Sequence, residues 1–186
     1  MSAGHGAGHI DPANKKVALL IALLALVLAF AETLGKAAQT SALENHLESS
    51  NLWAFFQAKT IRQTTIRTAA EQLEAESGPK ASEAAKKQID AWKKTAERYQ
   101  SEPETNEGRK ELMARAKEGE AKRDRAMAAY HNYEVASAAV QIAIVLASAQ
   151  IITGVAALLW IAYGLGAIGI LFSLIGLFWP TAVHLF

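Results

Sequence analysis

Charged side chains are absent from the last 52 of the chain's 186 residues. Residues 135–186 contain no Asp, Glu, Lys or Arg, which excludes a single soluble globule as the fold of the whole chain. A membrane-spanning helix needs roughly 20 apolar residues, so the segment has room for two such helices. We expect them over 135–154 and 158–179, joined by a short turn near Gly154, with residues 180–186 as a short tail.

A second uncharged run, residues 17–31, lies near the N-terminus. Because the aliphatic stem of Lys36 can carry the run to the membrane interface, we predict a transmembrane helix over 17–35. A secretory signal peptide is the alternative interpretation, since two lysines precede the run and Ala29-Phe30-Ala31 matches a cleavage site. The sequence leaves open whether this segment is ever cleaved.

Small residues recur every three or four positions in each predicted membrane helix. This spacing places each set on one helix face, and small faces let helices approach closely in lipid. We expect these faces to pack the helices together and to mediate self-association. The sets are Ala18, Ala22, Ala25 and Ala29; Ala136, Ala139, Ala143 and Ala147; and Ala162, Gly166, Gly169, Ser173 and Gly176.

Two glutamines, Gln141 and Gln150, interrupt the second predicted membrane helix. They are nine residues apart, so they point to opposite sides of that helix. An amide is costly to expose to lipid, and each should therefore find a partner on a neighbouring helix. We interpret both as packing contacts. A polar conduction path is the alternative, weakened by the lack of ionisable residues between 135 and 183.

Almost all charge lies between the first and second membrane helices, where residues 32–134 carry 17 basic and 17 acidic side chains. Helix-forming residues dominate the segment 36–134, with breaks near 78–79 and 102–105. The predicted fold class is therefore an all-α membrane protein with three transmembrane helices and a long extramembrane antiparallel coiled-coil-like helical hairpin. A short third helix folded back on the pair is the alternative. The balanced charge argues against nucleic-acid binding, which needs a basic surface.

An aromatic and aliphatic cluster containing Trp53 and Phe56 lies early in this segment and is a candidate packing or oligomer surface. Beyond the cluster, apolar residues become fewer. Two helices that share so few apolar contacts should need further partners to be stable. A homo-oligomer is the simplest solution. Lys59, Arg62 and Arg67 follow among threonines. We expect them to pair with glutamates of later helices or of another subunit, with an anion-binding stripe as the alternative.

Sites for catalysis, cofactors or metals are not indicated by the sequence. The chain has no cysteine, which excludes thiol chemistry and disulfides, and it lacks nucleotide-binding and zinc-protease motifs. We therefore predict no enzyme activity and no cofactor. His5 and His9 lie within residues 1–16, a His- and Gly-rich tail that we expect to be flexible. A mobile pair of imidazoles is a poor preformed metal site, so no metal ligand is assigned.

Four short stretches carry a resemblance to a known family. They are Asn14-Lys15-Lys16-Val17-Ala18-Leu19, Leu52-Trp53-Ala54-Phe55-Phe56-Gln57-Ala58-Lys59, Gln141-Ile142-Ala143-Ile144-Val145-Leu146-Ala147-Ser148 and Gly164-Leu165-Gly166-Ala167-Ile168-Gly169. The chain resembles a family of small bacterial inner-membrane proteins classified as a domain of unknown function. The resemblance implies one N-terminal and two C-terminal spans around a helical segment, and no catalytic residues. Family members often carry basic residues between the last two spans, whereas this chain has none there.

The orientation in a bacterial inner membrane is weakly indicated. Lys15 and Lys16 flank the first span and favour a cytoplasmic N-terminus, with the hairpin in the periplasm. The opposite orientation is favoured by basic residues near the end of the hairpin, namely Lys117, Lys122, Arg123 and Arg125.

Together these features predict a non-catalytic integral membrane scaffold that lies in a lipid bilayer. It would form a homo-oligomer through its small transmembrane faces and long helices. The alternative is an accessory subunit of a larger membrane complex. A channel or transporter component is a third hypothesis, which requires a polar lumen formed by Ser137, Gln141 and Ser148.

Overall fold

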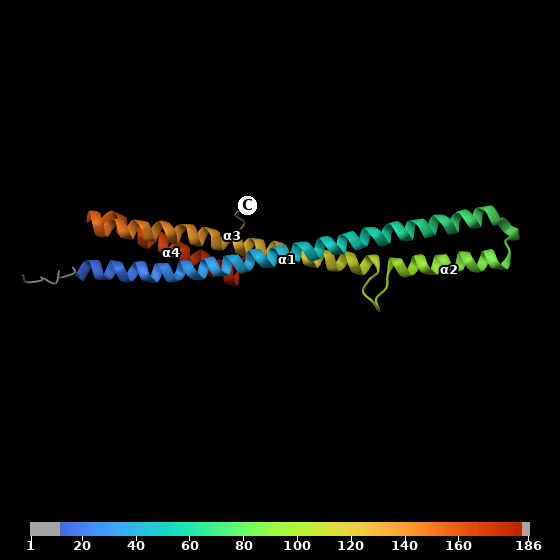
Figure 1. Cartoon of the computed structure of the whole chain (residues 1–186), viewed down its shortest axis with the longest axis horizontal. Helices are drawn as coiled ribbons and strands as arrows, with labels where there is room; N and C mark the ends of the chain where they lie inside the picture. The colour runs from blue at the N-terminus through green and yellow to red at the C-terminus, as the bar shows by residue number, and fades with distance from the viewer. Residues whose placement is uncertain (1–11, 184–186) are drawn as a thin grey trace, which may run out of the picture. The chain divides into compact units, whose positions relative to one another are not determined.

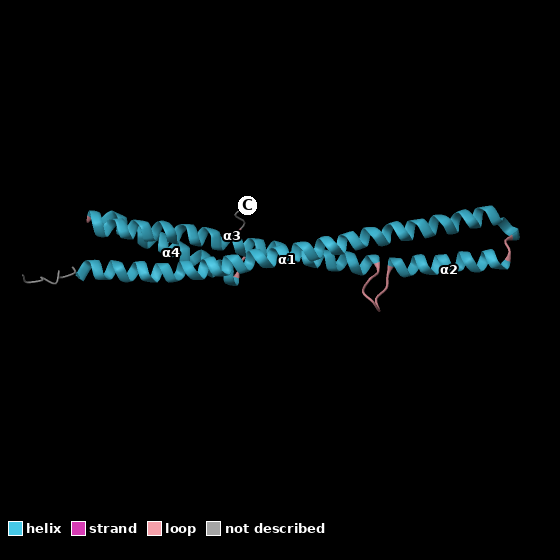
Figure 2. Ribbon diagram, viewed as in Figure 1, coloured by secondary structure: helices cyan, strands magenta, loops and turns pink. Residues whose placement is uncertain are grey.

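The computed structural model describes residues 12–183, and all regular structure in that range is helical (Figure 1). The helices are α1 (Pro12–Ser77), the short 3-10 helix η1 (Gly78–Lys80), α2 (Glu83–Gln100), α3 (Arg109–Thr153) and α4 (Ala156–Phe178). Only short loops join them, as Figure 2 shows, and the described range holds no strand, which confirms the all-α class. The tail histidines His5 and His9 lie outside the described residues.

Three of the helices, α1, α3 and α4, are each long and apolar enough to cross a membrane, which fits a membrane location. The chain divides into two units, and we describe each by itself. The apolar unit comprises residues 1–41 and 125–186, described over 12–41 and 125–183, and the charged unit comprises residues 42–124. Both α1 and α3 contribute residues to each unit.

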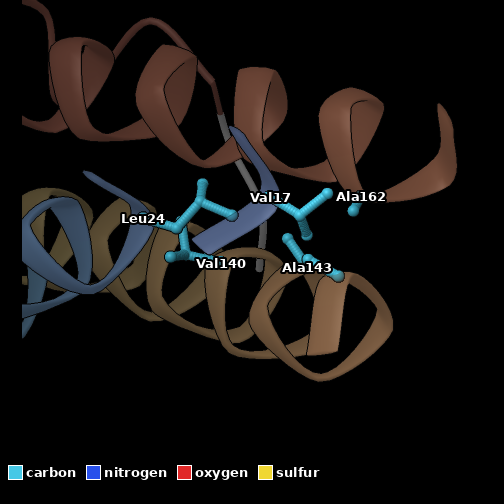
Figure 3. Close-up of a cluster of buried hydrophobic side chains, with 6 residues drawn as sticks. Val17, Leu24, Val140, Ala143 and Ala162 are labelled. Atoms are coloured by element: carbon cyan, nitrogen blue, oxygen red, sulfur yellow. The ribbon is translucent and has the colours of Figure 1, made fainter. Parts of the chain in front are cut away.

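The core of the apolar unit forms where the beginning of α1, the second half of α3 and α4 meet. Val17 and Leu24 of α1 point toward Val140 and Ala143 of α3 and Ala162 of α4, as Figure 3 shows. All five side chains are buried, and larger aliphatic side chains pack around them. Branched side chains on α1 therefore fill the space that small residues leave on α3 and α4.

Two glycines of α4 allow this close packing. A Cβ atom added at Gly166 would lie 2.8 Å from Cδ2 of Leu24. At Gly169 it would overlap Cγ2 of Val140 and come within 3.1 Å of the Ala136 carbonyl oxygen. Helices that approach so closely in an apolar unit typically have glycine or alanine at the contact.

The turn between α3 and α4 depends on Gly154, whose φ of 69° is left-handed and is adopted readily only by glycine. Its backbone N–H donates to the Gln150 carbonyl at 2.8 Å and closes the end of α3. The third predicted span, 158–179, is shifted slightly, because α4 begins at Ala156 and ends at Phe178. Pro180 follows shortly after, where it cannot disturb the helix.

In the charged unit, residues 42–77 of α1 run antiparallel to α2 and the beginning of α3. Glu74 of α1 pairs with Lys93 of α2 at 2.8 Å, and Trp53 donates to Glu120 of α3 at 2.8 Å. Partner numbers rise as the α1 numbers fall, which is the pattern of an antiparallel pair. Gly119 lies so close to α1 that an added Cβ would be 3.1 Å from Cβ of Ser49.

Two breaks delimit the helices of the charged unit. The first is at Gly78, which has a left-handed φ of 54°, and the Ser82 side chain then caps α2 by accepting from the Ala85 N–H at 3.2 Å. The second break lasts until Gly108, because α3 begins at Arg109 rather than near 106. No side chain fits at Gly108, since a Cβ there would come within 2.7 Å of Cα of Ser101.

Candidate functional site

The small-residue faces of the apolar unit have different environments. The predicted sets on α3 and α4 are buried against neighbouring helices, apart from the half-buried Ser173. The α1 set, by contrast, is exposed throughout, and α1 packs instead through Val17, Leu24 and Ala31, which are buried and seven residues apart. Packing of the α1 alanines within the chain was therefore a wrong prediction. The exposed set is Ala18, Ala22, Ala25 and Ala29.

The candidate packing residues of α4 all make contacts within the chain. Gly166 lies against Leu24, Gly169 against Val140, and Gly176 against the ring of Tyr133, whose Cε1 would be 3.0 Å from an added Cβ. The Ser173 hydroxyl donates to the Gly169 carbonyl at 2.9 Å, so its polar group is satisfied within α4. This face of α4 is therefore occupied by the chain's own helices.

The two glutamines of α3 have different environments. Gln141 is exposed, and its Nε2 donates to Oε1 of Glu32 and to the Ser137 hydroxyl, both at 3.2 Å. Gln150 is half-buried, and its Oε1 is buried without a hydrogen-bond partner among the described residues. Gln141 thus joins α3 to α1 through a polar contact, whereas Gln150 leaves an unsatisfied acceptor near the end of α3.

A groove of about 450 Å³ forms around Gln141 in the apolar unit. Gly35 of α1 allows the helices to meet at its base, because an added Cβ would be 3.2 Å from Cβ of Tyr133. The groove is lined by Ala31, Glu32, Gly35, Lys36, Gln39, Tyr130, Tyr133, Glu134, Ser137, Ala138 and Gln141. The groove therefore combines two carboxylates, a lysine, two amides and hydroxyl groups where the apolar segments of α1 and α3 give way to charge.

The two carboxylates of the groove are held differently. Glu134 accepts a hydrogen bond from the Tyr130 hydroxyl at 2.7 Å and lies 3.2 Å from Nδ1 of His131. Among the residues that the structure describes, Glu32 accepts only from Gln141, and no Lys, Arg or His lies within ion-pair distance of it. Glu32 can therefore accept hydrogen bonds from water, a cationic group or a further helix.

A buried polar network stabilises the charged unit. Lys59 is only 5% exposed, and its Nζ lies 3.3 Å from Oε2 of Glu102 and 3.9 Å from Oε2 of Glu107. The rings of Phe55 and Tyr99 contact the same ammonium, with centroids at 5.3 and 5.7 Å. Lys59 therefore pairs with glutamates, but these lie in the loop between α2 and α3. Among the described residues no ion pair is found for Arg62 or Arg67, so the predicted pairing holds for Lys59 alone.

Arg109, the first residue of α3, completes this network. Its Nε donates to the Thr60 hydroxyl at 2.9 Å, and its guanidinium lies over the ring of Phe56 at 5.0 Å. The same guanidinium donates to the side-chain oxygens of Gln63 and Gln100. Gln63 also donates to the Ala96 carbonyl at 2.8 Å, which links α2 to α1. The network thus joins three helical segments at the second break.

The aromatic cluster of the charged unit is also internal. Trp53 and Phe56 pack edge to face at 5.5 Å and contact Leu52, Leu112 and Ala116. Glu120 accepts the Trp53 indole N–H at 2.8 Å, so the polar edge of the ring is satisfied as well. Both candidate oligomer residues therefore have partners within one chain.

One family model matches residues 13–179 and thereby covers most of the chain. The chain belongs to the DUF4337 family, described as a domain of unknown function. The predicted resemblance to such a family is confirmed. No curated protein and no solved structure matches the chain.

The DUF4337 match includes both units described above. The groove at Gln141, the exposed alanines of α1 and the network at Arg109 all lie within residues 13–179. They are therefore features of the matched DUF4337 region, and none belongs to a separate appended domain.

Sequence reasoning missed two of the residues that organise this DUF4337 chain. Arg109 lies in the first turn of a helix, where a positive charge is unfavourable unless it is paired, and that conflict was the available signal. Asn132 is fully buried and donates to the Pro180 carbonyl at 2.9 Å, joining α3 to the end of α4. Its sequence context, between His131 and Tyr133, indicates an interface and gives no sign of this contact.

Proposed function

We propose that this DUF4337 protein is a non-catalytic integral membrane scaffold that self-associates in a bacterial inner membrane. Three transmembrane segments, from α1, α3 and α4, would lie in the lipid bilayer. Residues 42–124 would form a coiled-coil-like helical hairpin outside it. The proposal includes no enzymatic step and no cofactor.

One observation supports self-association most directly, namely the exposed alanine face of α1. In lipid, helix association depends on close packing, and small residues allow helix backbones to approach. The small faces of α3 and α4 are already occupied within the chain, whereas Ala18, Ala22, Ala25 and Ala29 contact no other helix closely enough to be buried. A second copy can use this face without disturbing the internal packing.

Native mass spectrometry of the full-length protein in nanodiscs tests this proposal. We expect a discrete multiple of the 20.0 kDa chain mass, and we expect Ala25→Leu to lower it, because the larger side chain keeps the helices apart. Ala167→Leu is the matched control, since Ala167 is exposed on α4 outside the small-residue face. A monomeric wild-type protein would contradict self-association, and a complex with another polypeptide would instead favour the accessory-subunit role.

The channel hypothesis is retained because of one contact. Ser137 and Gln141, which the channel hypothesis places in one lumen, lie together with Glu32 in one groove. A conducting lumen must also reach Ser148, which lies further along α3 and whose hydroxyl donates to the Ile144 carbonyl at 2.8 Å. Reaction of a Ser148→Cys variant with a membrane-impermeant thiol reagent would favour a channel, and complete protection would favour a sealed scaffold.

A further inference from the structure

One face of α1 within the charged unit is uncharged and exposed over its whole length. We call it the α1 stripe. It is formed by Leu43, Leu47, Ser50, Ala54, Ala58, Ile61, Thr65, Thr68 and Gln72, all exposed. Leu43, Leu47 and Ile61 are 58, 55 and 67% exposed, respectively. The stripe lies opposite the face that packs within the chain, where Leu52, Lys59, Gln63 and Ala70 are buried.

The absence of charge on the α1 stripe is unusual for its surroundings. Charged residues are frequent on the rest of this part of α1, including Glu44, Glu48, Arg62, Glu71 and Glu74. Solvated helix faces normally carry such residues, and large apolar side chains that share one exposed face indicate an interaction surface.

We propose that the α1 stripe docks on the α1 stripe of a second copy, parallel and in register. The inference rests on the proposed self-association and specifies its partner surface. Copies inserted in one membrane share an orientation, and residues 42–77 continue directly from the first predicted span, so the two stripes run in the same direction. A two-fold axis then places each residue opposite its own counterpart.

The absence of charge on the α1 stripe favours a second copy as its partner. In a parallel two-fold contact, any charged residue at the centre faces an identical charge, which is unfavourable. Between Leu43 and Gln72 the stripe has no such residue, so it is compatible with itself over its whole length. A second copy, which needs a charge-free centre along the whole contact, therefore fits the stripe.

The side chains also suggest how the two stripes fit. Serine and alanine occupy the middle, at Ser50, Ala54 and Ala58, and the larger Leu47 and Ile61 lie on either side. The helices can therefore approach most closely near Ala54. Because the stripe repeats at close to 3.6 residues, not 3.5, we expect a nearly straight contact without a pronounced left-handed supercoil.

The size of the contact explains why it would need the membrane. The stripe is about 45 Å long at 1.5 Å per residue and about 10 Å wide, so two copies would bury about 900 Å² in total. Stable interfaces between freely diffusing proteins bury about 1,200–2,000 Å². Anchoring both copies in one membrane raises their effective concentration and compensates for the smaller area.

Single-cysteine variants of the full-length protein test the docking, because the natural chain has no cysteine. Under mild oxidation in native membranes, we expect Ala54→Cys and Ile61→Cys each to form covalent dimers, since each thiol faces its counterpart within disulfide reach. Ala91→Cys is the matched control, an exposed alanine on α2. We expect several-fold less dimer from it. Equal cross-linking at all three positions would show that the covalent dimers form by random collision and would overturn the proposal.

Mixed samples separate the parallel contact from an antiparallel one. If a mixture of Ala54→Cys and Ile61→Cys proteins gives heterodimers while neither variant alone cross-links, the helices are antiparallel and the proposed register is wrong. A native mass that remains a multiple of the chain mass, without cross-linking at Ala54 or Ile61, would overturn the α1 stripe and leave self-association intact. A monomeric mass without cross-linking would overturn both.

A charge variant gives an independent measurement. Ile61→Lys places two ammonium groups opposite each other in the docked pair, so we expect its dimer fraction to fall several-fold in nanodiscs. Gln88→Lys, at an exposed position of α2, should leave the dimer fraction unchanged. Unaltered helical circular dichroism in both variants would show that they fold. An unchanged dimer fraction in folded Ile61→Lys protein would contradict the proposal.

Discussion

At the scale of single residues, two glycines of α4 offer a matched test of the apolar core. Gly169→Ala should destabilise the protein by about 1–3 kcal/mol, because the added methyl group overlaps Val140 and forces the helices apart. Gly164 has open space around its Cα, so Gly164→Ala should be neutral or stabilising by up to about 1 kcal/mol through helix propensity. Thermal unfolding in one detergent would measure both, and equal destabilisation would contradict the packing described.

Arg109 provides a second residue-scale prediction. Its removal in Arg109→Ala leaves the side-chain oxygen of the buried Gln63 without its donor, at a cost of about 1–3 kcal/mol. The oxygen of the exposed Gln100 still accepts from Nε2 of Gln63. Hydrogen exchange should show lost protection near the second break. Arg62→Ala removes an exposed guanidinium of α1 and serves as control. Equal protection in the two variants would show that the network does not stabilise the charged unit.

At the scale of elements, the loop before α3 is held by one carboxylate. Glu111 accepts from the Ser101 hydroxyl at 2.6 Å and from the Glu102 N–H at 3.2 Å. The hydrogen bond from Ser101, together with backbone hydrogen bonds, lowers the pKa of Glu111 below its ordinary value. A lowered carboxylate pKa means that the folded state favours the ionised form, so its stabilisation is present above the unfolded pKa.

This stabilisation should be lost as the pH falls through the folded pKa of Glu111. Hydrogen exchange of the Glu102 amide, corrected for its intrinsic pH dependence, should therefore show less protection in acid. The Glu111→Gln variant should lack this transition, because its amide does not titrate there. Glu104→Gln, in the same loop, should retain it. Persistence of the transition in Glu111→Gln protein would assign it to another group.

The elements also show what sequence patterns can and cannot predict. The long helices and their apolar segments follow from composition and charge, which act locally and need no knowledge of partners. The face through which α1 packs does not follow from composition or charge, because Ala22 and Leu24 are both suitable for a helix contact. The structure buries Leu24, since the small residues of α3 and α4 leave space for a branched side chain. Hydrogen bonds such as Gln141 to Glu32 depend on register between helices, which no local pattern defines.

At the scale of the whole molecule, the three proposed crossings would determine which ends share a side of the membrane. With spans in α1, α3 and α4, residues after α4 must lie on the same side as the charged unit. A contact within the apolar unit agrees with this arrangement. Asn132, just before the second proposed span, donates to the carbonyl of Pro180, just after the third, so these two residues lie at the same level. The charged unit and residue 181 should therefore lie on the same side of the membrane.

Labelling of single-cysteine variants in intact cells tests this arrangement and the proposed orientation together. An impermeant thiol reagent added outside the inner membrane should label both Ala91→Cys and Thr181→Cys, because Lys15 and Lys16 favour a cytoplasmic N-terminus. Protection of both until the cells are lysed would place the charged unit in the cytoplasm and retain the three spans. Labelling of only one would show an odd number of crossings between them and therefore a wrong number of spans. The pair of positions therefore separates an error in orientation from an error in topology.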